Sequence, residues 1–281
     1  MFSSIFHRGG HSAARSFLNI LKGDLAGHPF RGNQWTAGDR ADLKAYPFLK
    51  QINDGVTGLG GSGKGFQTGM TSAEDLISAG AKAMPEYMKM MGGIAGALGG
   101  RIVQGPDAKA LVQGGFKGTG TTPVLLVAPL KGAARIDEKV KNEEKGNYNA
   151  VRDIVRGTIA VNSPKDIPRV LAELKSQGVE MARAGKDRYS NPVMPYGYRD
   201  VLLNVKLPSG HVAELQINTK DMITAKEVDG HAWYETERRI RGKYQNSDAM
   251  AKSSPDAGAY MTAITKQIRI YGTAYRKDKG V

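Results

Sequence analysis

The stretch "YRDVLLNVKLPSGHVAELQINT" (residues 198–219) decides the fold. Its two halves each alternate apolar and polar residues, and a period of two predicts β-strands. The apolar members are Val201, Leu203, Val205 and Leu207, followed by Ala213, Leu215 and Ile217. The "PSGH" between the halves predicts a hairpin turn. The polar side of the second strand carries Glu214, Gln216 and Asn218, and it either faces water or forms the floor of a site.

Strand and helix signals continue on both sides of this hairpin. "PVLLV" (123–127) and "VRDIVRGTIAV" (151–161) are β-branched runs that predict strands. Ser163-Pro164 predicts a helix start, and Gly178 predicts its end. Further helices are expected over about 224–241 and about 256–275. The chain is therefore expected to have an α+β fold, with a mixed β-sheet flanked by helices.

The first 120 residues have a different character. Residues 1–70 are rich in turn-forming residues and are expected to be largely irregular. Residues 71–120 form a helical and Gly-rich segment, in which Ser72 and Asp75 make a capping box. Pro85 is expected to kink or split that helix, and the glycines of 92–100 are expected to end it. The domain proper is expected over residues 121–281, with a C-terminal helix.

One glycine-rich stretch imitates a phosphate-binding loop. "GLGGSGKG" (58–65) has Gly63 and Lys64 at the required spacing, but Gly65 stands where a P-loop needs Ser or Thr. No buried strand is expected before it, so a linker is the better interpretation. The nearby methionines of 84–91 are interpreted as packing residues.

Composition limits the kinds of partner. The 281 residues carry a formal net charge of +13, which favours polyanions such as nucleotides, nucleic acids or acidic lipids. The absence of cysteine excludes disulfides, thiol nucleophiles and cysteine-based metal sites, and the five histidines have no compact metal spacing. The sequence contains no run of about 18 apolar residues, so a membrane span is not expected. The N-terminus lacks the pattern of a secretion signal.

Several polar residues gather where the expected strands begin and end. Asp153 and Glu214, if on neighbouring strands, could together hold Mg²⁺, which prefers oxygen ligands. The cations Lys131, Arg135 and Lys139 are spaced four apart, as a helical phosphate clamp would require. An aromatic ring beside guanidinium and ammonium groups suits a nucleotide; the candidates are Tyr198, Arg199, Lys186 and Arg188. The alternatives are a solvated helix face, an ordinary strand tyrosine, and carboxylates paired only with arginines.

Taken together, "VRDIVRGTIAV", "KDRYSNPVMPYGYRDVLLNVKLPSGHVAELQINT" and "KEVDGHAWYE" resemble the synthetase domain of the RelA/SpoT family over about 120–245. Those enzymes transfer pyrophosphate from ATP to the 3′-hydroxyl of a guanosine nucleotide, making (p)ppGpp. Some toxin members modify adenine nucleotides or the 3′ end of tRNA instead. The resemblance implies a nucleotidyltransferase-like fold, a Mg²⁺-dependent pyrophosphokinase, and no hydrolase activity.

The resemblance also implies roles for individual residues. Asp153 matches the Mg²⁺-binding aspartate, and Glu214 matches the glutamate that binds metal and activates the attacking hydroxyl, with Gln216 in support. Tyr198 matches the tyrosine that stacks on the acceptor base. The other matched positions are Lys186 near the acceptor phosphates, Lys131 and Lys139 facing the ATP phosphates, and His231 of the later helix.

Three positions depart from the family pattern. Leu202 replaces a histidine, Asn218 replaces an arginine, and Pro129 replaces an arginine on the ATP side for which Arg135 is the expected substitute. These departures leave the acceptor open among GDP or GTP, ADP or ATP, and tRNA. The oligomeric state is also open, a homo-oligomer included.

A shorter resemblance lies near the N-terminus. "GHPFRGNQWT" (27–36) is similar to a motif of tailed-phage head-associated proteins. It implies a phage or prophage protein that acts as a toxin or effector in the cytoplasm of a host bacterium, or that is associated with the virion through capsid or DNA contacts. The rival hypothesis is a non-catalytic phage structural protein whose RelA/SpoT-like domain only binds nucleotide or nucleic acid.

Overall fold

The computed structural model describes residues 46–279, so the motif at 27–36 lies outside the described residues. One six-stranded sheet organises this part of the chain, in the order β1-β2-β3-β6-β5-β4. β1 is parallel to β2 and β3 is parallel to β6, while the other pairs are antiparallel. The strands are β1 Arg101–Gln104, β2 Val124–Val127, β3 Arg156–Val161, β4 Lys186–Asp187, β5 Val201–Lys206 and β6 Val212–Thr219. The predicted α+β class with a mixed sheet is confirmed.

The hairpin expected from residues 198–219 is β5 and β6. Leu203 pairs with Leu215 across the antiparallel ladder. The backbone N–H of Leu207 donates to the carbonyl of His211 at 2.9 Å and closes the turn, where Gly210 has a φ of 86°. Strand β6 is antiparallel to β5 on one side and parallel to β3 on the other. The parallel pair is possible because a helix after β3 carries the chain across the sheet.

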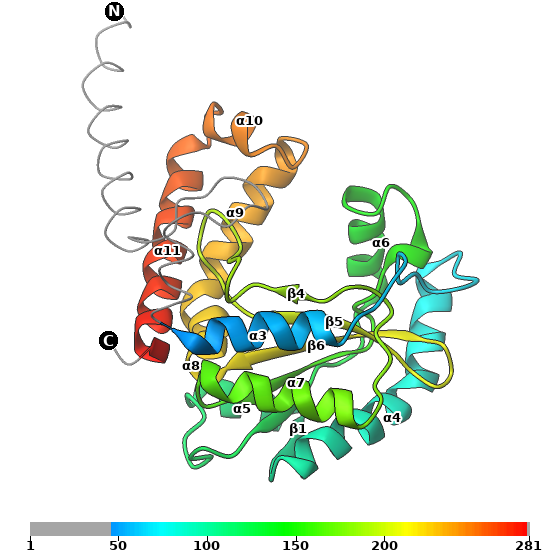
Figure 1. Cartoon of the computed structure of the whole chain (residues 1–281). Helices are drawn as coiled ribbons and strands as arrows, with labels where there is room; N and C mark the ends of the chain where they lie inside the picture. Colours follow the sequence, from blue (N-terminus) through cyan, green and yellow to red (C-terminus); the bar gives the residue numbers. More distant parts are fainter. Residues whose placement is uncertain (1–45, 280–281) are drawn as a thin grey trace, which may run out of the picture.

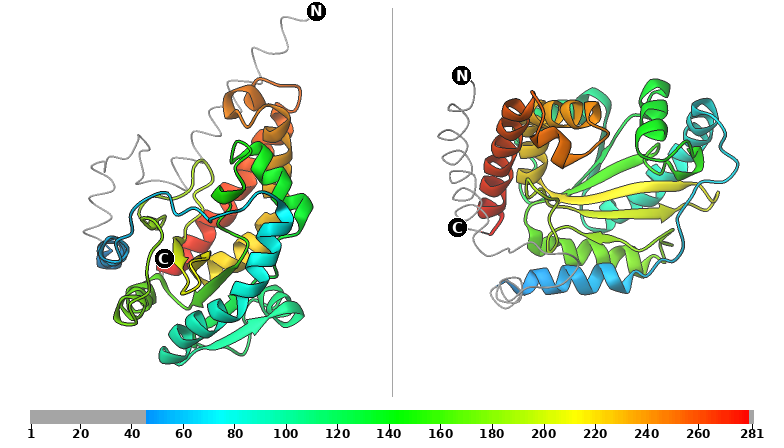
Figure 2. Two further views of the ribbon diagram at one scale, coloured as in Figure 1. Left: turned by 90° about the vertical axis from the view of Figure 1, so that its right-hand side faces the viewer. Right: turned by 90° about the horizontal axis from the view of Figure 1, so that it is seen from above.

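Helices cover the sheet unequally (Figure 1). The view from above in Figure 2 shows α3 and α7 on one side of the sheet and α6 on the other, with α9, α10 and α11 at one end. The α-helices are α3 Pro47–Gly58, α4 Ala73–Ala97, α5 Gly105–Gln113, α6 Ala133–Asn142, α7 Ile167–Ser176, α8 Lys220–Thr224, α9 His231–Lys243, α10 Asp248–Lys252 and α11 Ala257–Lys279. Short 3₁₀ turns occupy Tyr148–Ala150 and Pro164–Asp166, and a π-helical turn occupies Ala225–Gly230.

The main core lies on the apolar side of β6. Leu215 and Ile217 are fully buried there against α3, α4 and α7, in one cluster with Tyr87 and Leu171. The alternation of β6 therefore places Glu214 and Gln216 on the opposite face of the sheet, where both are only half-buried.

Helix α4 differs from its prediction. The capping box is present, since the Ser72 side chain accepts from the Asp75 backbone and the Asp75 side chain accepts in return. Of the expected kink or split at Pro85, the split is wrong, because the helix continues through Pro85 to Ala97. Tyr87, Met91 and Ile94 follow the proline and are fully buried. Their burial offsets the hydrogen bond that Pro85 cannot make.

The expectation of irregular structure over residues 1–70 is wrong for α3. This helix buries Phe48, Leu49, Ile52 and Val56 in the main core, so its apolar face rather than its turn-forming residues decides its conformation. The sheet also crosses the expected boundary at residue 120, because β1 pairs with β2.

The glycine-rich stretch at 58–65 is a loop that follows a helix, which is not the context of a P-loop. Just after this loop, the chain is hydrogen-bonded to the sheet. The Gln67 side chain donates to the Val212 carbonyl at 2.7 Å and accepts from the Val212 N–H at 3.0 Å. The Arg152 guanidinium donates to the Gly65 carbonyl at 3.0 Å. The segment therefore ties α3 and α4 to the start of β6.

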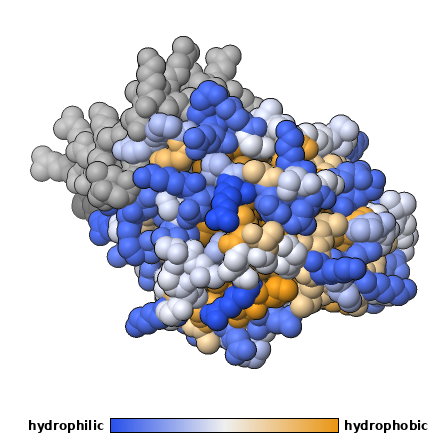
Figure 3. Space-filling view, turned by 60° about the horizontal axis from the view of Figure 1, so that its bottom comes forward, coloured by the Kyte–Doolittle hydropathy of each residue, from blue (hydrophilic) through white to orange (hydrophobic). Residues whose placement is uncertain are grey.

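Hydrophilic side chains cover most of the surface that Figure 3 shows, with small apolar patches between them. Large exposed apolar residues are scattered over several elements, as on ordinary protein surfaces. Over residues 46–279, every helix is too short or too polar to cross a bilayer.

Candidate active site

The first carboxylate of the site is Asp153, which lies just before β3. Its side chain forms ion pairs with Lys131 and, at 3.0 Å, with Lys139. Burial alone would raise the pKa of Asp153, but the ammonium groups of Lys139 and Lys131 outweigh it and hold the pKa at about 2. Asp153 is therefore an ionised carboxylate at neutral pH.

The two lysines reach Asp153 from different local structures. Lys139 lies on α6, whose other side buries Ile136 and Val140, whereas Lys131 lies in the loop before α6. Arg135 does not join them, although the four-residue spacing suggested one phosphate clamp. It pairs with Glu138 at 2.9 Å and with Glu235 of α9 at 3.4 Å. The observed cluster is thus Lys131, Lys139 and Asp153.

The second carboxylate is Glu214 on β6. The Gln216 side chain donates a hydrogen bond to it at 2.9 Å. Burial, followed by the negative charge of Asp153, raises the pKa of Glu214, and the hydrogen bond from Gln216 opposes the rise. Its register partner on β3 is Arg156, whose guanidinium donates to the Asp153 carbonyl at 3.2 Å. The β3–β6 pairing therefore brings the two carboxylates to one edge of the same face.

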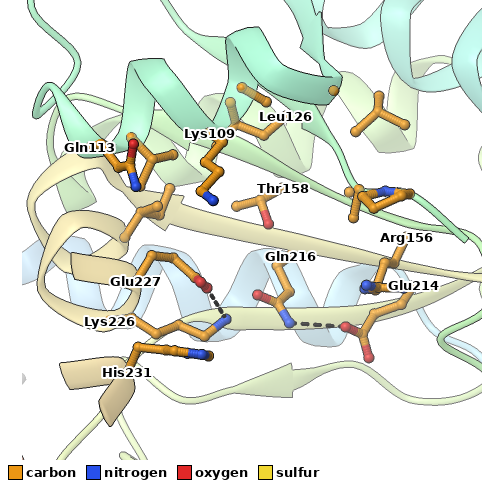
Figure 4. Close-up of a pocket in the computed structure, with 18 of the residues that line it drawn as sticks. Lys109, Gln113, Leu126, Arg156, Thr158, Glu214, Gln216, Lys226, Glu227 and His231 are labelled. Carbon is orange, nitrogen blue, oxygen red and sulfur yellow. Dashed lines mark hydrogen bonds and ion pairs between the residues drawn. The ribbon is translucent and has the colours of Figure 1, made fainter. Parts of the chain in front are cut away.

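A pocket of about 600 Å³ opens over this face. The sheet supplies its floor through Arg156, Thr158, Glu214 and Gln216. Figure 4 shows that side chains from three other elements point into it. These are Lys109 and Gln113 from α5, and Lys226, Glu227 and His231 from the π-helical turn and the start of α9. The volume is within the usual range for small-molecule sites.

Tyr198 forms part of the pocket wall. Its phenol accepts from the Asn218 amide at 3.0 Å and donates to the Asp200 carboxylate at 3.2 Å. Its ring contacts Tyr271 edge-on at 5.4 Å, and the Lys226 ammonium lies 5.6 Å from the ring centroid. Burial raises the pKa of Tyr198 well above its ordinary value, so the phenol stays protonated. The ring is held in one orientation by these contacts.

A second group of cations lies toward β4. Lys186 pairs in register with Leu202, which in turn pairs with Gln216, so the three share one face of the sheet. Burial lowers the pKa of Lys186, and the positive charges of Arg188, Arg183 and Arg152 lower it further. Arg188 is held at 3.2 Å by Asp200, which is fully buried.

Arg199 is the one predicted binding residue that points into the core. It is 1% exposed, its guanidinium lies 3.7 Å from the centroid of the Tyr275 ring, and it donates to the Tyr189 carbonyl. It connects the end of the 189–199 loop to α11. This position gives no support to a nucleotide contact by Arg199.

Six polar residues of the pocket were not predicted from the sequence. Arg156 and Thr158 carried a usable signal, because they alternate with buried residues on a strand next to Glu214. The residues of α5 and of the π-helical turn carried none, because only packing brings them over the sheet. The six are Lys109, Gln113, Arg156, Thr158, Lys226 and Glu227.

The two carboxylates fit a magnesium ion. Among residues 46–279, no three His, Cys, Asp or Glu side chains cluster as a complete metal cage. Mg²⁺ usually takes only one or two carboxylates, and it takes its remaining ligands from water and substrate phosphates. The ionised Asp153 and the half-buried Glu214 provide such a pair.

Comparisons with known proteins match the part of the chain that contains this site. Residues 129–239 match the protein-family model described as "Region found in RelA / SpoT proteins". The chain is 29% identical over 170 residues to the (p)ppApp synthetase toxin Tas1 of Pseudomonas aeruginosa. That match covers 54% of this chain and 36% of the relative, so the chain spans about a third of the relative's length.

Two solved structures also match part of this chain. The complex between the type VI effector Tas1 and its immunity protein has 23% identity and a TM-score of 0.45, covering 73% of this chain and 96% of the effector chain. The small alarmone synthetase 1 of Bacillus subtilis, bound to its product pppGpp, has 20% identity and a TM-score of 0.39, covering 56% and 75%. By the family match, residues 129–239 form a RelA/SpoT domain, and this domain contains Asp153, Glu214, Lys131, Lys139 and Tyr198.

Proposed function

We propose that this chain is a Mg²⁺-dependent pyrophosphokinase that transfers pyrophosphate from ATP to the 3′-hydroxyl of a nucleotide. One observation carries the proposal. Glu214, a carboxylate with a raised pKa, lies in the floor of a nucleotide-sized pocket beside Asp153, which two lysines hold ionised. The match of residues 129–239 to the RelA/SpoT family supports the same reaction class.

The proposed reaction is a single displacement at phosphorus. The acceptor 3′-oxygen bonds to the β-phosphorus of ATP, the bond from that phosphorus to the α,β-bridging oxygen breaks, and AMP leaves with that oxygen. The hydroxyl proton passes to Glu214, whose raised pKa makes it a better base than an ordinary glutamate. Gln216 keeps the Glu214 carboxylate oriented through its hydrogen bond.

Most of the catalytic effect is expected from charge and positioning, as is usual in phosphoryl transfer. A bound Mg²⁺ would neutralise charge on the transferred phosphates, with Asp153 and Glu214 as its protein ligands. Lys131 and Lys139 form ion pairs with Asp153. When substrate is bound, their ammonium groups would also bind its phosphate oxygens. Tyr198, fixed by Asn218 and Asp200, would stack on the acceptor base.

The acceptor is proposed to be a purine nucleotide, with Lys186 and Arg188 toward its phosphates. Guanosine nucleotides are the first candidate from the motif resemblance. Adenosine nucleotides are the second, because the 29% identical relative is named as a (p)ppApp synthetase toxin. Leu202 pairs with Lys186, and Asn218 donates to the Tyr198 phenol, so both substitutions lie next to residues proposed to contact the acceptor.

A transfer assay tests the proposal. The full chain is incubated with Mg²⁺ and γ-labelled ATP, together with GDP or GTP, with ADP, or with deacylated tRNA. Label is expected on a purine nucleotide, and the Glu214→Gln variant is expected to lose it. Label on tRNA alone would contradict nucleotide synthesis. Label on none of them, with the variant identical to wild type, would favour a protein that only binds nucleotides.

We further propose that the product acts as a toxin in a bacterial cytoplasm. The support is the named function of the Tas1 relative, whose solved structure includes an immunity protein. A phage origin with capsid or DNA contacts and a homo-oligomer both stay predictions. Expression of wild type and of Glu214→Gln in a bacterium tests toxicity, and equal growth of both would contradict it.

A further inference from the structure

Helix α5 forms a wall of the pocket but lies outside the region that matches the RelA/SpoT family. The match begins at residue 129, whereas α5 ends at Gln113. Lys109 and Gln113 of α5 line the pocket together with Thr158 and Gln216 of the sheet. The pocket is therefore completed by a segment that the family match does not include.

This wall is firmly attached to the fold. Val112 and Phe116 are buried in a small apolar cluster with Val124 and Ala160 of the sheet and Ile223 of α8. These strand positions lie on the same face as Gln216, because Ala160 pairs with Asn218 two residues further along β6. Helix α5 also packs against the π-helical turn. The cluster fixes how α5 is rotated, and Lys109 lies one turn before Val112 and Gln113.

The Lys109 side chain points from α5 into the middle of the pocket, toward Thr158 (Figure 4). The residue is exposed, and among the described residues no carboxylate forms an ion pair with it. The nearest acidic groups in the pocket already have other partners, since Glu227 pairs with Lys226 at 3.1 Å and Glu214 accepts from Gln216. Lys109 therefore presents an unneutralised ammonium group to whatever enters the pocket.

We propose that Lys109 binds a phosphate group of a nucleotide in this pocket and so determines affinity for the phosphate chain. The inference rests on the proposed function and names an additional binding residue for that site. An ammonium group on a flexible stem suits a phosphate oxygen as a point charge. Lys109, Arg156 and Lys226 then surround the bound phosphates from α5, β3 and the π-helical turn.

Equilibrium binding tests this assignment without turnover. The probes are α,β-methylene-ATP, in which the bond to be broken is blocked, then GDP and ADP as acceptors, and adenosine and guanosine as phosphate-free controls. Lys109→Ala is compared with wild type, with Lys109→Arg, and with Lys117→Ala. Lys117 is an exposed lysine close to α5 in sequence that does not line the pocket, so it controls for the loss of one charge.

Lys109→Ala is expected to weaken binding of at least one phosphorylated probe about tenfold, the effect of one charge-assisted hydrogen bond. Binding of the nucleosides and of all probes to Lys117→Ala is expected to stay at wild-type level, and Lys109→Arg is expected to recover most of the loss. A loss confined to α,β-methylene-ATP assigns Lys109 to the donor, and a loss confined to GDP or ADP assigns it to the acceptor.

Wild-type affinity of Lys109→Ala for every probe would overturn the inference, as would equal losses for nucleotides and nucleosides. A wild-type protein that binds α,β-methylene-ATP but transfers no label would contradict the proposed function alone, because the effect of Lys109→Ala on binding would still support the inference. A wild-type protein that binds no probe would overturn both.

Discussion

At the residue scale, Asn218 explains how one departure from the family pattern is accommodated. Its amide donates to the Tyr198 phenol at 3.0 Å and accepts from the Tyr189 phenol at 2.9 Å. All three side chains are buried, so each hydrogen bond replaces water that cannot reach them. Asn218 is therefore a positioning residue for the pocket tyrosine, and it does not itself line the pocket.

Glu214→Gln tests the proposed base directly. The amide keeps the size of the side chain and removes its proton affinity, so the transfer rate is expected to fall by about 100-fold or more. The wild-type rate should rise with pH along an acid limb that lies above the ordinary pKa of a glutamate, because burial and Asp153 raise the pKa of Glu214. Initial rates measured across pH would check both expectations.

Gln216→Leu serves as the matched variant. Removing the hydrogen bond that lowers the pKa of Glu214 should move the acid limb of the rate profile to higher pH. An unchanged limb in this variant, or a Glu214→Gln rate near that of wild type, would show that Glu214 is not the base.

At the element scale, the π-helical turn Ala225–Gly230 decides the far side of the pocket. Sequence periodicity predicted one helix over 224–241, but the structure has α8, the turn and α9 in succession. The wider turn presents Lys226 and His231 to the pocket, and such turns are often found at functional sites. Gly230 is needed there, because an added Cβ would lie 2.9 Å from the Ala225 carbonyl oxygen and 3.0 Å from the Tyr271 hydroxyl.

Gly230→Ala is expected to lower the free energy of unfolding by about 1–3 kcal/mol, because the methyl group must displace either the Ala225 carbonyl or the Tyr271 side chain of α11. Gly242→Ala, within α9 and with no atom within 4 Å of an added Cβ, is expected to raise it by up to about 1 kcal/mol. Denaturant unfolding of the two variants gives the comparison. Equal stability of both variants would contradict the close packing of the turn.

At the scale of the whole molecule, α11 closes the end of the sheet and makes stability depend on pH. Asp278 of α11 is 9% exposed and accepts from the Thr219 hydroxyl at 2.8 Å. Its other oxygen, Oδ1, is buried without a hydrogen-bond partner among the described residues. Burial raises the pKa of Asp278 to about 7, against the opposing bond from Thr219. The folded protein therefore holds a proton that the unfolded chain releases near its ordinary pKa of 3.8.

A raised carboxyl pKa stabilises the protein most below the unfolded pKa and loses that contribution as pH rises through about 7. Asp278→Asn, which imitates the neutral form, is expected to remove this loss and to be more stable than wild type at alkaline pH by up to about 4 kcal/mol. Free energies of unfolding measured below pH 3.8, between 3.8 and about 7, and above about 7 check it. Parallel pH dependence in the two proteins would contradict a buried, protonated Asp278.

Local patterns in the sequence were sufficient for much of the sheet and part of the site. The alternation in residues 198–219 predicted the β5–β6 hairpin, and the same alternation separated Glu214 from the core. The capping box at Ser72 and the helix start at Ser163-Pro164 depend on neighbours in sequence, so they too were predictable. Asp153 and Glu214 were recognisable because their motifs are local.

Tertiary structure alone decided the rest, because it depends on contacts between residues far apart in the chain. The β3–β6 pairing brought Asp153 and Glu214 to one face, and long-range burial carried α4 through Pro85 and turned Arg199 away from the site. Packing of α5 over the sheet brought Lys109 into the pocket, with no local signal in residues 105–113. The sequence by itself determined which groups can react, and the packing decided which of them meet.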